Sequence, residues 1–153
     1  MTSIPNLHIS TFGGVKAEVT VYIQSRDDFT HAGTFIVQAA IQFDPSSADY
    51  PTGEIRITVD MSDSAKAIFN STSIELINSF GKHNPTIVFT GRCEMKPQEK
   101  IPEFKGCKYW MFIADNRKSP SIIGFVIIDN TGRRIAYGTG TIKSGRLEVQ
   151  SND

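Results

Sequence analysis

The clearest pattern in this chain is the alternation of apolar and polar residues at every second position. In one segment apolar side chains occupy the odd positions from Val15 to Ile23, with Lys16 and Glu18 between them. Successive side chains of a strand point to opposite faces, so this pattern predicts a strand with one buried face. Because strands of a parallel sheet are buried on both faces, alternation also favours antiparallel pairing. The segments that alternate in this way are 15–24, 35–43, 55–61 and 87–95.

Two later segments are apolar at nearly every position and predict strands that are covered on both faces. They span residues 109–114 and 122–128. The run Asp129–Gly132 then indicates a turn into a strand over 134–142, and Ser144-Gly145 indicates a second turn. The C-terminal third is therefore expected to be a three-strand meander that ends near Gln150. A short strand over residues 7–12 is expected to open the fold.

The segment 62–81 is expected to hold one short helix. Ser62 or Asp63 has the side chain of a helix N-cap, and apolar residues follow near helical spacing. The run Ser71-Thr72-Ser73 is poor helix material, so we expect the helix to end near Asn70, and the remaining residues favour neither helix nor strand.

Seven to nine strands with one helix predict a small, closed antiparallel β-barrel, with a two-sheet β-sandwich as the alternative. The whole chain, residues 1–153, is expected to form a single β domain, since no linker or low-complexity stretch interrupts it. A chain of this length can bury roughly two-thirds of its surface and so needs no metal or disulfide to fold.

Composition and the N-terminal residues predict a soluble protein of the cytoplasm. No apolar run approaches the roughly twenty residues of a membrane-spanning helix. Residues 1–10 lack the basic start and apolar stretch of a secretory signal, so the expected location is cytoplasmic. Cys93 and Cys107 flank a proline-containing connection on apparent strands. We expect two buried thiols there, with a cross-strand disulfide as the alternative.

The formal net charge is zero, but the two halves of the chain differ. Residues 1–81 carry four Lys or Arg and nine Asp or Glu, whereas residues 82–153 carry twelve and seven. The simplest interpretation is that strands from both halves interleave and the asymmetry averages out. With no net charge to keep copies apart, a homo-oligomer is expected to be possible.

The chain carries no local motif of an enzyme, a metal site or a nucleotide site, which favours a non-catalytic protein that needs no cofactor. A β-barrel isomerase or cyclase can nevertheless work without such a motif. The best candidates for an acid or base are then His31, Asp27, Asp28 and Asp115, although residues around His31 are more simply explained as a polar hairpin connection.

The most informative chemical feature is a contrast in side-chain size between two strands. Gly138 and Gly140 lie on one face of the strand over 134–142, and Trp110 and Phe112 share one face of the strand over 109–114. Glycine in a strand often marks a bend or the close approach of another group. The functional interpretation is a ligand-binding cleft, and the structural one is that aromatic rings fill the space over the glycines. The candidate ligand-binding residues are Trp110, Phe112, Gly138 and Gly140, with Tyr109 and Tyr137 as polar contacts.

Four short segments, in their order along the chain, carry a resemblance to a known family. They are Gly33–Phe35, Ile41–Pro45, Ile57–Asp60 and Asn84–Phe89. Their order is similar to that in bacterial lipocalin-like isoprenoid-binding proteins. The resemblance implies a barrel that holds an apolar ligand, although residues 1–10 lack the periplasmic signal common in that family.

Three functions follow from these features, in order of preference. The first is a non-catalytic module that binds a largely apolar small molecule. The second is a self-assembling or partner-binding protein that uses the doubly apolar strands as an interface. The third is a barrel enzyme without a local motif. The basic pairs Arg117-Lys118 and Arg133-Arg134 would suit single-stranded nucleic acid, but the neutral charge of the domain argues against that partner.

Overall fold

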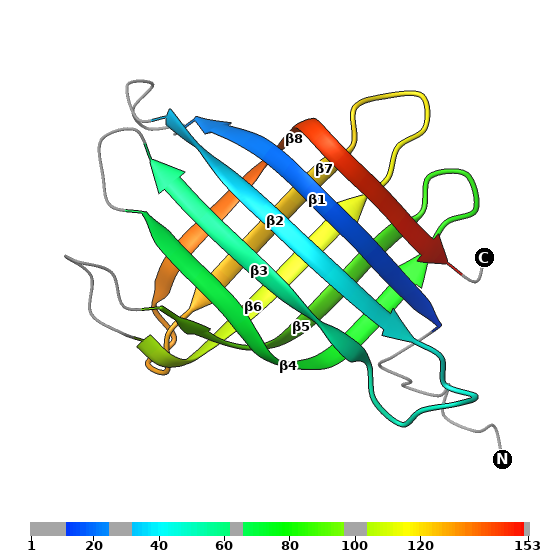
Figure 1. Cartoon of the computed structure of the whole chain (residues 1–153), viewed down its shortest axis with the longest axis horizontal. Coiled ribbons are helices and arrows are strands. Elements are labelled where there is room, and N and C mark those ends of the chain that lie inside the picture. Colours follow the sequence, from blue (N-terminus) through cyan, green and yellow to red (C-terminus); the bar gives the residue numbers. More distant parts are fainter. Residues whose placement is uncertain (1–11, 25–31, 62–65, 97–103, 152–153) are drawn as a thin grey trace, which may run out of the picture.

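The computed structural model describes residues 12–24, 32–61, 66–96 and 104–151. These residues form eight strands joined by turns and loops (Figure 1). The strands are β1 (Gly13–Gln24), β2 (Ala32–Phe43), β3 (Thr52–Met61), β4 (Ala67–Phe80), β5 (Thr86–Met95), β6 (Phe104–Ala114), β7 (Ile122–Ile128) and β8 (Arg134–Ser151).

The strands close into one antiparallel barrel. Each strand is hydrogen-bonded to the next in sequence, and β8 returns to pair with β1. The predicted barrel is therefore confirmed and the sandwich alternative is wrong. Closure follows from the strongly amphipathic early strands. Val19 of β1 lies opposite Val37 of β2, and Val37 lies opposite Ile57 of β3, so one continuous apolar surface curves around the inside.

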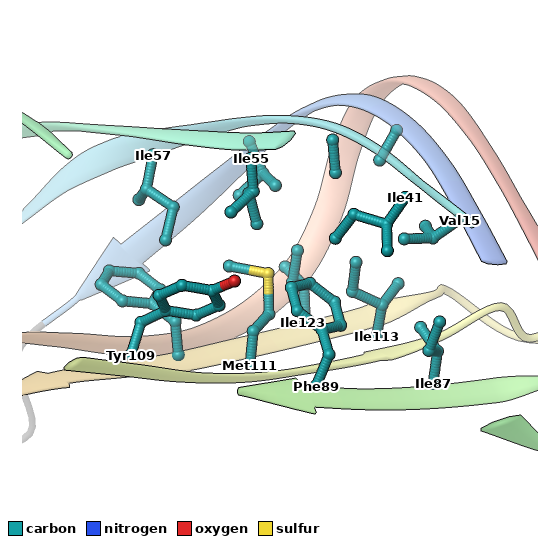
Figure 2. Close-up of a cluster of buried hydrophobic side chains, with 14 of the residues drawn as sticks. Val15, Ile41, Ile55, Ile57, Ile87, Phe89, Tyr109, Met111, Ile113 and Ile123 are labelled. Carbon is teal, nitrogen blue, oxygen red and sulfur yellow. The ribbon is translucent and has the colours of Figure 1, made fainter. Parts of the chain in front are cut away.

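The interior of the barrel is filled by large apolar side chains that meet from opposite walls. Figure 2 shows side chains of β1–β3, such as Ile41 and Ile57, pointing toward Phe89 and Met111 on the other wall. The largest fully buried side chains include Phe35, Phe89 and Phe125 from three different strands. The rings of Phe35 and Phe125 meet edge to face, with centroids 4.8 Å apart.

The predicted helix is wrong wherever the segment is described. Residues 67–80 form strand β4, while 62–65 lie outside the described residues. The cause is a pair of irregularities in the pairing of β4 with β5, between Ser71 and Ser73 and between Ile74 and Leu76. Each extra residue shifts the inward face along the chain, and this spacing resembles that of a helix. The buried positions of β4 are Phe69, Ile74, Ile77 and Ser79.

Strand β8 is longer than predicted. The turn expected at Ser144-Gly145 is wrong, because β8 continues to Ser151 with an irregularity in its pairing to β1. Gly145 takes a positive φ of 115° there, and a Cβ at this position would collide with the Glu18 carbonyl oxygen. The strand expected over 7–12 lies outside the described residues except for Phe12, which precedes β1. No helix in the described ranges is long and apolar enough to cross a membrane.

Candidate functional site

The wall of the barrel separates the six predicted ligand-binding residues into two sets. Trp110, Phe112 and Tyr137 lie at outward positions. Trp110 is opposite Val126 of β7, which is in turn opposite Tyr137 of β8, so both aromatic residues belong to one outer row. The side chains of Trp110 and Tyr137 are 41% and 60% exposed. The remaining three predicted residues face the interior.

Gly138 and Gly140 make room for parts of the core, not for Trp110 and Phe112. A Cβ at Gly138 would lie 3.3 Å from the rings of Phe35 and Phe125 and from a methyl group of Ile23. A Cβ at Gly140 would lie 2.7 Å from the carbonyl oxygen of Tyr22. The space beside these glycines is therefore occupied by core side chains and by the β1 backbone. The structure does not bring the glycines and Trp110 together in one cleft.

Tyr109 is a buried residue whose hydroxyl group already has a protein partner. Its side chain is 3% exposed, and its hydroxyl donates a hydrogen bond to the Ser73 carbonyl oxygen across 3.0 Å. Ser73 lies at the irregularity of β4. Tyr109 reaches it over Gly91 of β5, where a Cβ would lie 2.6 Å from the hydroxyl oxygen. Burial raises the pKa of Tyr109 above its usual value. This side chain therefore ties β6 to the bent part of β4.

Outward apolar side chains gather on β6 and β7, joined by Val88 of β5 and Tyr137 of β8, with threonines at the neighbouring outward positions of β5 and β8. On successive strands, the apolar side chains stand beside one another instead of alternating with charged ones. All are exposed or half-buried. We call this surface the outer apolar face and define it as Val88, Trp110, Phe112, Ile122, Val126, Ile128 and Tyr137.

The centre of the outer apolar face is held by an aromatic contact and by a glycine that the sequence interpretation missed. The Trp110 and Phe112 rings are tilted by 50°, with centroids 5.6 Å apart. Gly124 lies opposite Phe112, and a Cβ there would collide with the Phe112 ring. Phe112 is thus held flat against β7. The signal for this contact was the single glycine inside the apolar run of 122–128.

A row of basic side chains borders one end of the outer apolar face. Arg92, Lys108 and Arg134 are exposed and occupy the row in which Ile128 is the apolar member. The Arg134 guanidinium lies 4.7 Å from the centroid of the Tyr137 ring, and Arg92 is paired with Glu75 at 2.8 Å. Cation–π contacts of this kind hold a charge over an aromatic ring at an exposed site. The face therefore has a positively charged border at this end of the strands.

The residues considered for catalysis do not gather into a site in the described part of the chain. His31, Asp27 and Asp28 lie outside the described residues. Asp115 follows β6, where its backbone amide donates a hydrogen bond to the Pro85 carbonyl oxygen at 2.9 Å. His83 is exposed in the turn between β4 and β5. Within the described ranges, no cluster of three or more His, Cys, Asp or Glu side chains could hold a metal ion.

Four surface grooves lie on the opposite side of the barrel, and their linings mix charged, polar and apolar side chains. One of about 340 Å³ runs over the outside of β1–β4 between Glu18, Gln38 and Arg56. The other three also lie along β1–β4 and the C-terminal half of β8, and none of the four is lined by any of the six predicted residues. These four grooves are therefore separate from the described surface around Trp110.

No family model, curated protein or solved structure matches this chain.

Proposed function

We propose that this barrel is a non-catalytic interaction module whose outer apolar face packs against the same face of a second copy of the chain. The observation that carries the proposal is the row Trp110, Val126 and Tyr137, which is apolar across three strands and faces outward. Contiguous exposed apolar surface is unusual on a monomer and marks interaction sites. Tryptophan and tyrosine are also the residue types that contribute most to protein interfaces.

The packed interior favours an interface over an internal ligand site. A carrier of apolar molecules encloses its ligand in a cavity lined by inward side chains. Here the inward positions near Gly138 are filled by Phe35 and Phe125, and the hydroxyl of Tyr109 is bonded to Ser73. Binding of an apolar small molecule stays a prediction, and its place on this barrel would be the outer apolar face.

The arrangement of charge supports a second copy as the occupant. A two-fold axis between the copies and perpendicular to the strands would place each basic row over the opposite end of the partner's face. The outward strand residues at that end, Ala114, Ile122 and Thr141, carry no charge, and the exposed Arg117 and Lys118 lie beyond them in the β6–β7 loop. The three cations of the row would then not oppose one another. The net charge of zero also leaves no overall repulsion between copies.

Sedimentation equilibrium over a wide concentration range tests the proposal. The wild-type chain of 16.9 kDa should show twice that mass at high concentration. Trp110→Glu places a charge at the centre of the face and should weaken association by roughly thirtyfold or more, the loss expected at an interface hot spot. The matched control is Gln38→Glu, which adds the same charge on the outer side of β2 and should leave association unchanged.

Three results would overturn the proposal. One is a wild-type protein that stays monomeric at several hundred micromolar. Another is equal weakening of association by the two variants. The third is a monomer that carries a reproducible bound molecule in native mass spectrometry and loses it in Trp110→Glu, which would favour the small-molecule prediction.

A further inference from the structure

Two cysteines face each other inside the barrel at the end of the β5–β6 pairing. Cys93 of β5 and Cys107 of β6 are direct cross-strand partners. Both are free thiols, 2% and 1% exposed. Direct partners in an antiparallel pair have Cα atoms roughly 4.5 to 5.5 Å apart, and disulfides form across Cα separations of about 4.4 to 6.8 Å. The backbone therefore already holds the two residues at bonding range.

The side chains and the local backbone both favour bond formation. Both side chains are buried in the barrel, and each thiol shifts the pKa of the other, as neighbouring sulfur atoms do. The β5–β6 register shifts directly beyond this pair, between Cys93 and Glu94. Gly106, next to Cys107, has a φ of 87° and open space where a Cβ would stand. A bulge beside the pair gives the backbone room for the small adjustment that a disulfide dihedral requires.

We propose that Cys93 and Cys107 form a redox-active pair that closes to a disulfide between β5 and β6 when hydrogen peroxide is present. In the first step a Cys107 sulfur–oxygen bond forms, the peroxide O–O bond breaks, and a sulfenic acid and water result. In the second step the Cys93 sulfur attacks the sulfenic sulfur, and a second water leaves. Two thiols lose two protons and two electrons, which the peroxide accepts.

The order of the two steps follows from the asymmetry of the pair. The interaction with Cys93 lowers the pKa of the Cys107 thiol. The interaction with Cys107, together with burial, raises the pKa of the Cys93 thiol. The thiolate is the form that attacks peroxide, so Cys107 reacts first and Cys93 resolves the intermediate. Cys107 is as buried as Cys93, and its neighbour Gly106 is exposed with open space where a Cβ would stand.

Oxidation of the folded, purified chain tests the pair. With hydrogen peroxide, the intact mass should fall by the mass of two hydrogen atoms, and a thiol reductant should reverse the change. A peptide map under non-reducing conditions should join Cys93 to Cys107. The disulfide would close a loop of modest length between two paired strands, and should raise the melting temperature by about 5 °C or more.

Matched variants separate this pair from general cysteine oxidation. Cys93→Ser should leave a sulfenic acid on Cys107 that a dimedone probe traps, and Cys107→Ser should react much more slowly with peroxide. Trp110→Glu should oxidise as the wild type does, because the pair is independent of the outer apolar face. Disulfides only between chains, or two thiols that survive peroxide in the folded protein and oxidise only after unfolding, would overturn the proposal.

Discussion

The two sides of the barrel wall look alike from the inside and differ on the outside. Along the outer side of β8 and β1, residues of opposite charge stand opposite each other: Lys16 faces Glu148, and Glu18 faces Arg146. Along β6–β8 the corresponding outer row holds Trp110 and its apolar neighbours. The inward side chains of both regions are apolar, and they are buried along most of β1, β6 and β7 and partly buried along β8.

The comparison shows that the inward side chains stabilise the fold, whereas the outward side chains determine what the surface can bind. Inward side chains of both regions contribute to the same core, so they stabilise the closed barrel wherever they lie. Cross-strand pairs of opposite charge on the outside add a few tenths of a kcal/mol each and keep that side hydrated. The outer apolar face gains little from staying exposed to water and would gain much more from being covered.

The largest expected difference in the free energy of unfolding is between replacing an inner aromatic residue and replacing an outer one. Phe125→Ala removes a fully buried ring and should lower the free energy of unfolding by about 3–5 kcal/mol. Trp110→Ala, on the outer face, should cost about 1 kcal/mol or less in the monomer. Urea unfolding at low protein concentration measures both. Comparable losses would show that Trp110 belongs to the core of the barrel.

Two tyrosines offer the next contrast. Tyr109→Phe removes the hydroxyl that bonds the Ser73 carbonyl and should cost roughly 1–3 kcal/mol, the range for leaving a buried polar group without its partner. Tyr137→Phe is the matched control, because its ring is exposed on the outer face. Thermal unfolding of both variants should separate them. An unaffected Tyr109→Phe would mean that water replaces the hydroxyl at the bulge of β4.

A smaller loss of stability is expected from a substitution on the charged outer side of β8 and β1. Arg146→Glu places two carboxylates opposite each other, because Arg146 faces Glu18, and should cost about 0.5–1 kcal/mol at low salt. High salt should reduce this loss by screening the repulsion. Association of the copies should remain as in the wild type. If the variant also became monomeric, the charged side and not the apolar one would be part of the interface.

The smallest expected effect is on the pH dependence of stability, through one carboxylate in the β7–β8 turn and one in the turn after β2. Asp129 accepts hydrogen bonds from Thr131 and Arg133 in the β7–β8 turn. The bond from the Thr131 hydroxyl contributes most to lowering the pKa of Asp129. The pKa of Asp44, after β2, is lowered chiefly by its bond to the Ser46 hydroxyl. Each carboxylate therefore adds stability above its unfolded pKa, and that stability is lost as pH falls through the folded pKa.

The corresponding measurement compares melting temperatures of the wild type with Asp129→Asn and Asp44→Asn. The difference should be constant above about pH 5 and should shrink as the pH falls below the carboxyl's usual value near 3.8. A difference that grows as the pH falls would contradict the assignment of these carboxylates as hydrogen-bond acceptors. The two variants should behave alike, since the turns serve the same purpose on both sides.

The sequence predicts the strands and the direction of their side chains only where apolar and polar residues alternate. Strands such as 15–24 and 35–43 have one apolar face, so both their existence and their inward side could be predicted. The bulges of β4 could not, because an extra residue there converts strand spacing into helix-like spacing. On 109–114 both faces are apolar, so alternation cannot say whether Tyr109 or Trp110 points inward. Only the pairing with neighbouring strands decides this.

The six candidate residues lie on two sides of the barrel wall for the same reason. Gly138 and Trp110 were linked by size alone, and size does not reveal the side of the wall on which a residue lies. The inward glycine meets Phe35 and Phe125, whereas the outward tryptophan has Phe112 beside it. Gly124, which accommodates the Phe112 ring, was a visible but unused signal.

The fluorescence of Trp110 tests the central claim most directly, because it is the single tryptophan of the chain and lies at the centre of the outer apolar face. Its emission should be recorded across the concentration range in which sedimentation detects association. We predict that the emission shifts to shorter wavelength in step with the doubling of mass, because burial removes water from the indole ring. A doubling of mass with unchanged Trp110 emission would place the interface elsewhere and contradict the account.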